Sequence, residues 1–308
     1  MTRRGALLFA ALGIAWGIPY LLIKIAVGEL DPAFVAFARS ALGGLLLVPV
    51  AIFRKQLIPV LKRWRPLLIF AVVEIVIPWF FLSTAETRLP SATAGLLLAA
   101  VPLVGVAVAF ATRNNPGFGW LNWLGILLGM AGVAALVGLD VGGSDLVAVG
   151  QMAIVAVGYA IGPVILSRYM SDLPGIGVMG SALLLAAVIY VPIVFLVGDW
   201  PSVVPSAPAI WSVLGLAVIC SALAFVLMFA LIAEMGPTRM TTITYINPAV
   251  AIVAGALVLG ERITWVTVVG FVLVLGGSYL VTRRHAVPAT PPEPAAAVLG
   301  ESTGERKA

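Results

Sequence analysis

Glu74 is the residue of this chain whose type and position best suit it to chemistry. It stands well inside an apolar run that begins near residue 66, and an ionisable group at such depth in a membrane usually faces a cavity or a partner. Pro78 follows four residues later and has no N–H to donate to the carbonyl of residue 74. A carboxyl beside a free carbonyl could bind an amine, a cation or a proton. The alternatives are a neutral carboxyl hydrogen-bonded between helices, or an ion pair with Arg39.

Two basic residues also lie within apolar runs. Arg39 could attract an anionic group of a substrate, but its long side chain could equally brace a neighbouring helix. Lys24 lies nearer the end of its run, and its ammonium group could extend to the membrane surface. Both residues are therefore candidates for binding or coupling, with a structural role as the alternative.

Three aromatic residues are candidates for the wall of a substrate cavity. Trp16 and Trp79 lie inside apolar runs, away from the interfacial positions where tryptophan is usual. Tyr159 follows Trp16 by 143 residues, and each precedes a proline, Pro19 or Pro163. Together they could clamp a substrate from two sides, although simple helix packing explains each of them equally well.

Prolines and nearby polar residues mark expected helix kinks. We expect kinks at five of the intramembrane prolines, because each lacks one backbone hydrogen bond: Pro19, Pro78, Pro102, Pro163 and Pro248. Before the last of these stand Thr244, Tyr245 and Asn247, which could bind a substrate or could satisfy the freed carbonyls internally.

The composition disfavours an enzyme. The only histidine, His285, lies in a polar tail, and the only cysteine, Cys220, lies in an apolar run. No glycine-rich phosphate loop with Lys-Ser/Thr is present. We therefore expect no metal, cofactor or catalytic group. A channel or a scaffold is the alternative function, but a channel would require a ring of like groups.

The elements that must position these residues are membrane helices. The 308 residues are 62% hydrophobic and 10% charged, and about twenty apolar residues cross a bilayer. We predict an all-α integral membrane protein with spans at 5–27, 33–53, 66–84, 90–111, 120–138, 146–167, 174–197, 209–232, 237–259 and 264–282.

Charge places both termini in the cytoplasm. With an inside N-terminus, 14 of the 18 Lys and Arg residues fall on the inner side and two on the outer, as the positive-inside rule requires. This partition leaves no basic face for nucleic acid. We expect acidic outer loops with Glu29, Asp31, Glu86, Asp140, Asp145, Asp199 and Glu261, and a disordered cytoplasmic tail at 285–308.

Proline pairs at nearly constant spacing indicate a duplicated five-helix unit. The spacings are 144, 143 and 146 residues for Pro19/Pro163, Pro49/Pro192 and Pro102/Pro248. Because five is odd, the second unit (146–282) must run inverted relative to the first (5–138). Such inverted repeats support transport by alternating access. The longest of these offsets aligns Glu74 with Cys220, so the acid occurs in one half only.

The chain resembles the EamA-type units of the drug/metabolite transporter superfamily over about residues 5–282. The resemblance rests on the run from Ala15 to Lys24, Asp31-Pro32 with Arg39, Thr244-Tyr-Ile-Asn-Pro248, and Leu259-Gly-Glu261-Arg262. It implies ten helices, inverted five-helix repeats, a central cavity and movement of small metabolites or drugs, often outward. The chain departs from the pattern with Asn247, where many relatives carry an acid, and with Asn115 opposite Glu261.

The expected partners are a small-molecule substrate and the lipid bilayer of the cytoplasmic membrane. Since the sequence holds no ATPase domain, a gradient must supply the energy, through proton coupling at Glu74 or through exchange. No oligomeric state is predicted.

Overall fold

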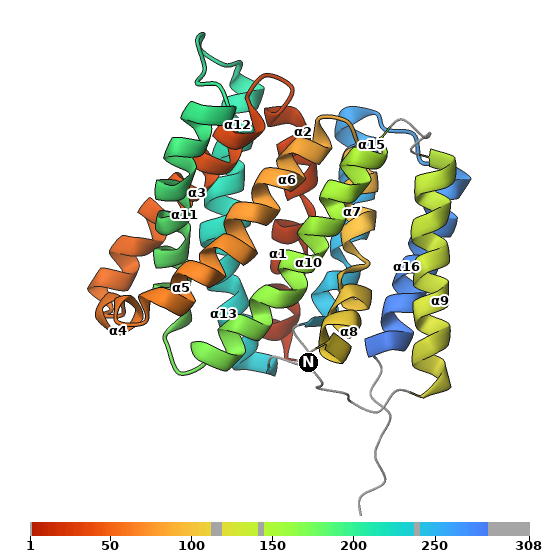
Figure 1. Cartoon of the computed structure of the whole chain (residues 1–308), viewed down its shortest axis with the longest axis horizontal. Helices are drawn as coiled ribbons and strands as arrows, with labels where there is room; N and C mark the ends of the chain where they lie inside the picture. Colours follow the sequence, from red (N-terminus) through yellow and green to blue (C-terminus); the bar gives the residue numbers. More distant parts are fainter. Residues whose placement is uncertain (1, 112–118, 141–144, 237–240, 283–308) are drawn as a thin grey trace, which may run out of the picture.

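The computed structural model describes residues 2–111, 119–140, 145–236 and 241–282. These ranges consist of helices and their connecting turns, and the helices lie side by side as a bundle (Figure 1). The predicted tail at 285–308 and the first residues of the predicted ninth span, 237–240, fall outside the described ranges.

Long apolar helices confirm the all-helical membrane prediction. Within the described ranges, nine helical segments are long and apolar enough to cross a membrane, at Arg3–Ala26, Pro32–Phe53, Trp64–Glu86, Ser91–Val108, Trp120–Gly138, Leu146–Tyr169, Gly175–Val197, Ala207–Met235 and Trp265–Thr282. The predicted ninth span, 237–259, corresponds to a shorter apolar helix, Ile243–Leu259. It ends at Gly260, whose φ of 66° is left-handed and favours glycine.

Local irregularities divide several spans into shorter elements. The first half contains α1 (Arg3–Gly17), α2 (Pro19–Ala26), α3 (Pro32–Phe53), α4 (Leu57–Leu61), α5 (Trp64–Phe70), η1 (Ala71–Val76), α6 (Ile77–Glu86), α7 (Ser91–Leu98), α8 (Val101–Ala111), α9 (Trp120–Ala135) and η2 (Leu136–Asp140). The second half contains α10 (Leu146–Tyr169), α11 (Gly175–Val197), α12 (Ala207–Ala217), η3 (Val218–Leu223), α13 (Ala224–Met235), η4 (Thr241–Tyr245), α15 (Asn247–Leu259) and α16 (Trp265–Thr282).

The predicted proline kinks divide into two classes. Pro19 opens α2, Pro102 is the second residue of α8 and Pro248 the second residue of α15, so these three prolines mark helix breaks. Pro78 is the second residue of α6, directly after the π turn at 71–76. Pro163 instead lies inside α10, which is helical without interruption from Leu146 to Tyr169. The pair Pro102/Pro248 therefore marks a break in both halves, whereas the pair Pro19/Pro163 marks a break in the first half only.

Two π-helical turns occupy corresponding places in the two halves. The turn η1 joins α5 to α6 and contains Glu74, while η3 joins α12 to α13 and contains Cys220. Each π turn widens the helix and redirects side chains, and such turns recur at functional sites. The structure thus gives Glu74 and Cys220, which are 146 residues apart, the same kind of local backbone.

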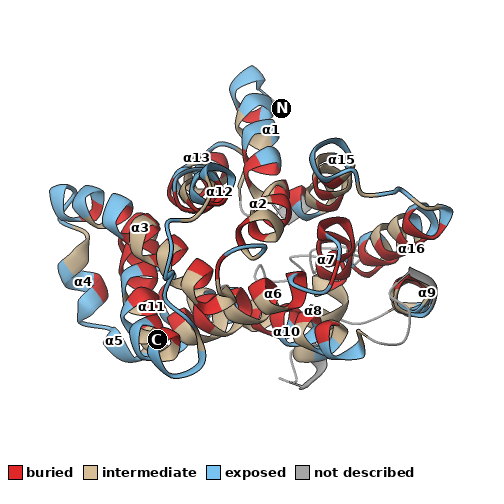
Figure 2. Ribbon diagram, turned by 90° about the horizontal axis from the view of Figure 1, so that it is seen from above, coloured by how far each residue is buried: buried red, intermediate tan, exposed pale blue. Residues whose placement is uncertain are grey.

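Helices of the first half pack mainly against helices of the second half. Figure 2 shows α3 beside α11 at one edge of the bundle and α9 beside α16 at the other, with α6 and α10 between them. The close approach of α9 and α16 requires glycine, because a Cβ on Gly125 would lie 2.7 Å from the carbonyl oxygen of Gly277.

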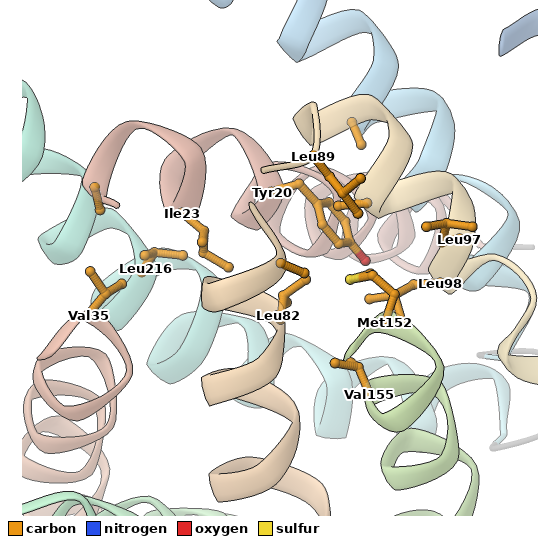
Figure 3. Packing of buried hydrophobic residues seen from close by; sticks show 14 of the residues in the cluster. Tyr20, Ile23, Val35, Leu82, Leu89, Leu97, Leu98, Met152, Val155 and Leu216 are labelled. Atoms are coloured by element: carbon orange, nitrogen blue, oxygen red, sulfur yellow. The ribbon is translucent and has the colours of Figure 1, made fainter. Parts of the chain in front are cut away.

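Buried apolar residues join the halves through the centre. Tyr20 and Ile23 of α2, Leu82 of α6 and Met152 of α10 belong to one buried cluster together with Leu216 of α12 (Figure 3). Burial of each such side chain contributes about 1.5–3 kcal/mol when water is the reference. These four helices therefore pack around one point, which positions the polar residues next to it.

Candidate functional site

Arg39 forms the middle of a buried polar cluster. It lies on α3 and is 6% exposed. Its guanidinium carbon is 3.7 Å from the centre of the Trp79 ring, and its Nε donates a hydrogen bond to Ser221 Oγ at 3.0 Å. The side chain therefore connects α3 and α6 of the first half with η3 of the second. We call Arg39, Glu74, Trp79, Tyr159 and Ser221 the central cluster.

Ser221 holds its place through the π turn. Its hydroxyl donates a 2.8 Å hydrogen bond to the carbonyl of Leu216, five residues earlier, which is the spacing of a π turn. The same oxygen accepts from Arg39. Sequence reasoning missed Ser221, and its position next to Cys220, the counterpart of Glu74, was the available signal.

Glu74 lies where the two halves meet. Its carboxyl oxygen Oε2 is buried and has no hydrogen-bond partner among the described residues. A Cβ on Gly162 of α10 would be only 1.8 Å from that oxygen, and a Cβ on Gly158 would be 2.6 Å from both Val73 O and Pro78 Cγ. Because these two residues have no side chains, the π turn η1 and the Glu74 carboxyl pack closely against α10 at both positions.

Tyr159 lies on α10 between these two glycines in sequence. Its hydroxyl hydrogen-bonds with the side chain of Trp79, and Arg39 and Glu74 are among the charged groups that act on it. The aromatic groups of Trp79 and Tyr159 therefore adjoin both the cationic and the acidic member of the central cluster. Tyr190 of α11 binds the π turn η1 by donating a 2.6 Å hydrogen bond to Val76 O.

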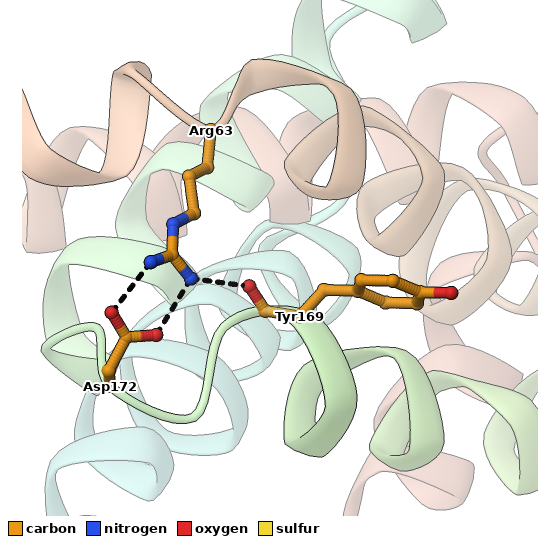
Figure 4. A network of polar contacts seen from close by, with 3 residues as sticks. All are labelled: Arg63, Tyr169 and Asp172. Carbon is orange, nitrogen blue, oxygen red and sulfur yellow. Dashed lines mark hydrogen bonds and ion pairs between the residues drawn. The ribbon is translucent and has the colours of Figure 1, made fainter.

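Glu74 and Arg39 do not form an ion pair. Over the described ranges the only ion pair within 4.0 Å joins Arg63 Nη1 to Asp172 Oδ1 at 2.7 Å. That pair is exposed, and Arg63 also donates to the carbonyl of Tyr169 at 2.8 Å (Figure 4). The ion-pair alternative for Glu74 is therefore not met in this conformation.

Trp16 and Lys24 lie apart from the central cluster. The ring of Trp16 packs edge-on against Phe225, with 6.4 Å between centroids, in a different cluster from Tyr159. Lys24 Nζ donates to the carbonyls of Glu86 at 2.7 Å and Leu89 at 2.9 Å. Lys24 thus holds the turn between α6 and α7 rather than extending to the membrane surface.

The polar residues before Pro248 point in different directions. Tyr245 bonds to Ser278 O at 3.3 Å and to Thr282 Oγ1 at 2.5 Å, both on α16, whereas Thr244 is exposed. The Asn247 side-chain oxygen is buried without a partner among the described residues. Its backbone carbonyl lies 3.2 Å from the point where Gly17 would carry a Cβ, so Asn247 adjoins the break between α1 and α2.

Glu86 corrects one sequence expectation. We expected it in an acidic outer loop, but it is the last residue of α6 and has no exposed surface. The helix continues two residues beyond the predicted span because the turn to α7 comes only at Leu89 and Pro90. Both carboxyl oxygens of Glu86 lack a partner among the described residues.

An open cavity lies at the predicted outer end of the bundle. Its volume is about 320 Å³, and its lining includes Glu29, Asp31, Asp199 and Trp200. The central cluster is separate from it, and there Arg39 and Trp79 are closely packed.

Comparison with known proteins agrees with this arrangement. The model of the EamA-like transporter family matches residues 3–138 and again 146–283. The uncharacterized inner membrane transporter YedA of Escherichia coli K12 is 31% identical over 250 residues, covering 78% of each chain. The uncharacterized transporter YvbV of Bacillus subtilis is 29% identical over 263 residues, covering 80% of this chain and 81% of the relative.

A solved crystal structure shares the fold. It aligns with a TM-score of 0.65 at 21% identity, covering 92% of this chain and 97% of the other. With long membrane helices throughout and two family matches that together cover nearly all of them, this chain belongs to the EamA-like transporter family.

Proposed function

We propose that this chain is a secondary transporter that exports a small metabolite or drug across the cytoplasmic membrane by alternating access. The two family matches and the loop charges support two inverted halves with both termini in the cytoplasm. A gradient of protons or of a counter-substrate supplies the energy.

The observation that carries this proposal is the Glu74 carboxyl oxygen Oε2, which is buried without a hydrogen-bond partner among the described residues. A buried carboxyl oxygen without a partner is costly, and this one projects from η1 of the first half against Gly162 of α10 in the second. Because the Glu74 carboxyl contacts both halves, its surroundings change whenever the two halves move relative to one another. Glu74 is therefore suited to bind the basic group of a substrate, or a proton, in one conformation and release it in another.

The other members of the central cluster complete the proposed site. Trp79 and Tyr159 provide aromatic surface for a substrate, and Arg39 provides a fixed positive charge that offsets an acidic group. Asn247 adds a buried amide oxygen at the break in the first span. Trp16, Lys24, Thr244 and Tyr245 belong to the helices that must move as the site opens.

The test is transport by purified protein in liposomes. A panel of radiolabelled metabolites and drugs is offered with and without an imposed pH gradient, to wild type and to Glu74→Gln. We expect wild type to show gradient-driven flux of at least one compound. The same flux should be at least ten-fold lower in Glu74→Gln, since the amide cannot ionise.

Asp199→Asn serves as the control, because Asp199 is an exposed carboxylate at the predicted outer end. It should transport like wild type. Equal flux in wild type and Glu74→Gln would remove Glu74 from the mechanism, and the absence of flux for every compound and gradient would contradict the transporter proposal.

A further inference from the structure

Glu86 carries a second buried carboxyl that the central cluster does not use. The residue has no exposed surface, and neither carboxyl oxygen completes a hydrogen bond with a described residue, although the group lies beside the backbone of Lys24. An ionised carboxylate without partners in such a place is strongly disfavoured, whereas a protonated one loses far less solvation. The surroundings therefore suit a carboxyl that holds a proton.

Lys24 stands next to this carboxyl but binds elsewhere. Its ammonium is held by the backbone carbonyls of Glu86 and Leu89, at 2.7 and 2.9 Å, and no ion pair within 4.0 Å joins it to the Glu86 carboxyl. A cation that binds neutral carbonyls beside an acid is the arrangement expected when the acid is neutral. Once the acid ionises, its charge competes for the same ammonium.

The elements around Glu86 carry several further ionisable groups. Five of them interact electrostatically with the Glu86 carboxyl, and they lie on α2, α3, α10 and the segment before α16. They are Tyr20, Lys24, Arg39, Tyr159 and Glu261. On the π turn preceding α6 the charged group is Glu74. No charged residue occurs on α7, whose sequence is Ser-Ala-Thr-Ala-Gly-Leu-Leu-Leu.

The turn between α6 and α7 is held at both of its ends. Lys24 binds the carbonyls of Glu86 and Leu89 at its start, and the Glu261 carboxylate accepts the N–H groups of Ser91 at 2.8 Å and Ala92 at 3.1 Å at its end. Glu261 belongs to the second half of the chain. If Lys24 were released, the turn would lose these contacts with α2 of the first half and keep only its contact with Glu261 of the second half.

We propose that Glu86 is a proton-binding site, and that Lys24 moves from the carbonyls of the α6–α7 turn to the Glu86 carboxylate when the proton leaves. Proton binding and release would then tighten and loosen one side of a turn near the predicted outer end, a turn whose other side is bound by Glu261 of the second half. As a coupling device this rests on the proposed transport function, but as a proton site it does not.

The site is distinct from Glu74. Twelve residues separate the two carboxyls along the third span, which is about 18 Å at 1.5 Å per residue. One carboxyl therefore lies in the central cluster, where a substrate would bind, and the other lies at the end of the same helix.

Infrared difference spectroscopy on the whole protein in lipid nanodiscs tests the proton site without any substrate. Spectra recorded between acidic and alkaline pH report each carboxyl that loses its proton. We expect the protonated-carboxyl band of wild type to lose about one carboxyl's intensity in Glu86→Gln and to remain unchanged in Asp199→Asn. An equal band in wild type and Glu86→Gln would overturn the proposal.

Hydrogen exchange of the α6–α7 turn tests the movement of Lys24. After correction for the intrinsic pH dependence, the amides of residues 87–89 in wild type should exchange faster at alkaline pH, and Glu86→Gln should show no such increase. Lys24→Gln should exchange fast at both pH values. An increase that persists unchanged in Glu86→Gln would overturn the switch, provided that the variant keeps the wild-type unfolding temperature.

The spectroscopic and transport assays separate the two proposals. Loss of the band in Glu86→Gln together with no flux in any protein supports the proton site and contradicts the transport function. Flux driven by a pH gradient in wild type, together with an unchanged band in Glu86→Gln, supports the transport function and overturns the proposal that Glu86 binds a proton.

Discussion

Glu74 can occupy its place because Gly162 has no side chain. The point where a Cβ would stand on Gly162 is 1.8 Å from the carboxyl oxygen and 2.7 Å from the carboxyl carbon, so the two groups exclude one another. The carboxyl therefore depends on a residue of the opposite half for its space. This dependence allows its role to be tested without altering its charge.

We expect Gly162→Ala to displace the Glu74 carboxyl. Overpacking of this kind typically costs about 1–3 kcal/mol, so the unfolding temperature should fall and any transport that needs Glu74 should weaken. Gly150→Ala is the matched control on the same helix, because no atom lies within 4 Å of its Cβ position. Equal stability and transport in both variants would show that Glu74 is not constrained by α10.

On the scale of the elements, sequence and structure agree where a pattern acts locally. Apolar length predicted the spans, and Pro19, Pro102 and Pro248 predicted helix breaks because a proline at a helix start has no N–H to lose. Pro163 shows the limit of this inference. Its lost hydrogen bond does not by itself end a helix that is packed along its length against α6 and α8.

The candidate site was predictable in part for the same reason. Glu74, Arg39, Trp79 and Tyr159 stand out because each is unusual in an apolar run, and the structure brings all four together. Ser221 is an ordinary residue in a membrane helix, and only the π turn gives it a role. Glu86 was misplaced because a charged residue near a span end is normally read as part of a loop.

Glu261 gives a prediction at the scale of one helix. Its carboxylate accepts the first two N–H groups of α7, where a negative charge is favourable. We expect Glu261→Gln to destabilise the protein by about 0.5–2 kcal/mol, as losses of helix N-caps do, and to raise hydrogen exchange in the first turn of α7. Arg262→Gln, an exposed neighbour, is the control. Unchanged exchange at Ser91 and Ala92 in Glu261→Gln would contradict a capping role.

At the scale of the whole molecule, polar contacts join the halves at both ends. At the predicted outer end, the Glu29 carboxylate accepts hydrogen bonds from the hydroxyl of Ser206 and, at 2.8 Å, from its N–H. At the predicted inner end, Arg63 pairs with Asp172 through two hydrogen bonds at 2.7 and 2.8 Å. We call these contacts the outer clasp and the inner clasp.

The outer clasp should depend on pH. Its hydrogen bonds from Ser206 lower the pKa of Glu29 below its usual 4.5. A lowered pKa in the folded protein means that the contact stabilises the fold above the ordinary pKa and loses this contribution as pH falls through the lowered one. The unfolding temperature of wild type should therefore exceed that of Glu29→Gln at neutral pH, and the difference should vanish in acid. A difference that grows in acid would contradict the assignment.

Opposite effects of the two clasps would demonstrate that the halves exchange conformations. Cys220, the single cysteine, is 1% exposed and lies beside the central cluster, so it reports which side of the membrane gains access. Glu29→Gln should raise labelling by an impermeant maleimide from outside, and Asp172→Asn should raise it from the cytoplasmic side. Because an exposed ion pair contributes about 0.2–1 kcal/mol, the latter increase should reach at most about five-fold, with Cys220→Ser as the unlabelled control. If both variants raised labelling from the same side, the two clasps would not have opposite effects on access. That result would contradict the alternating-access proposal.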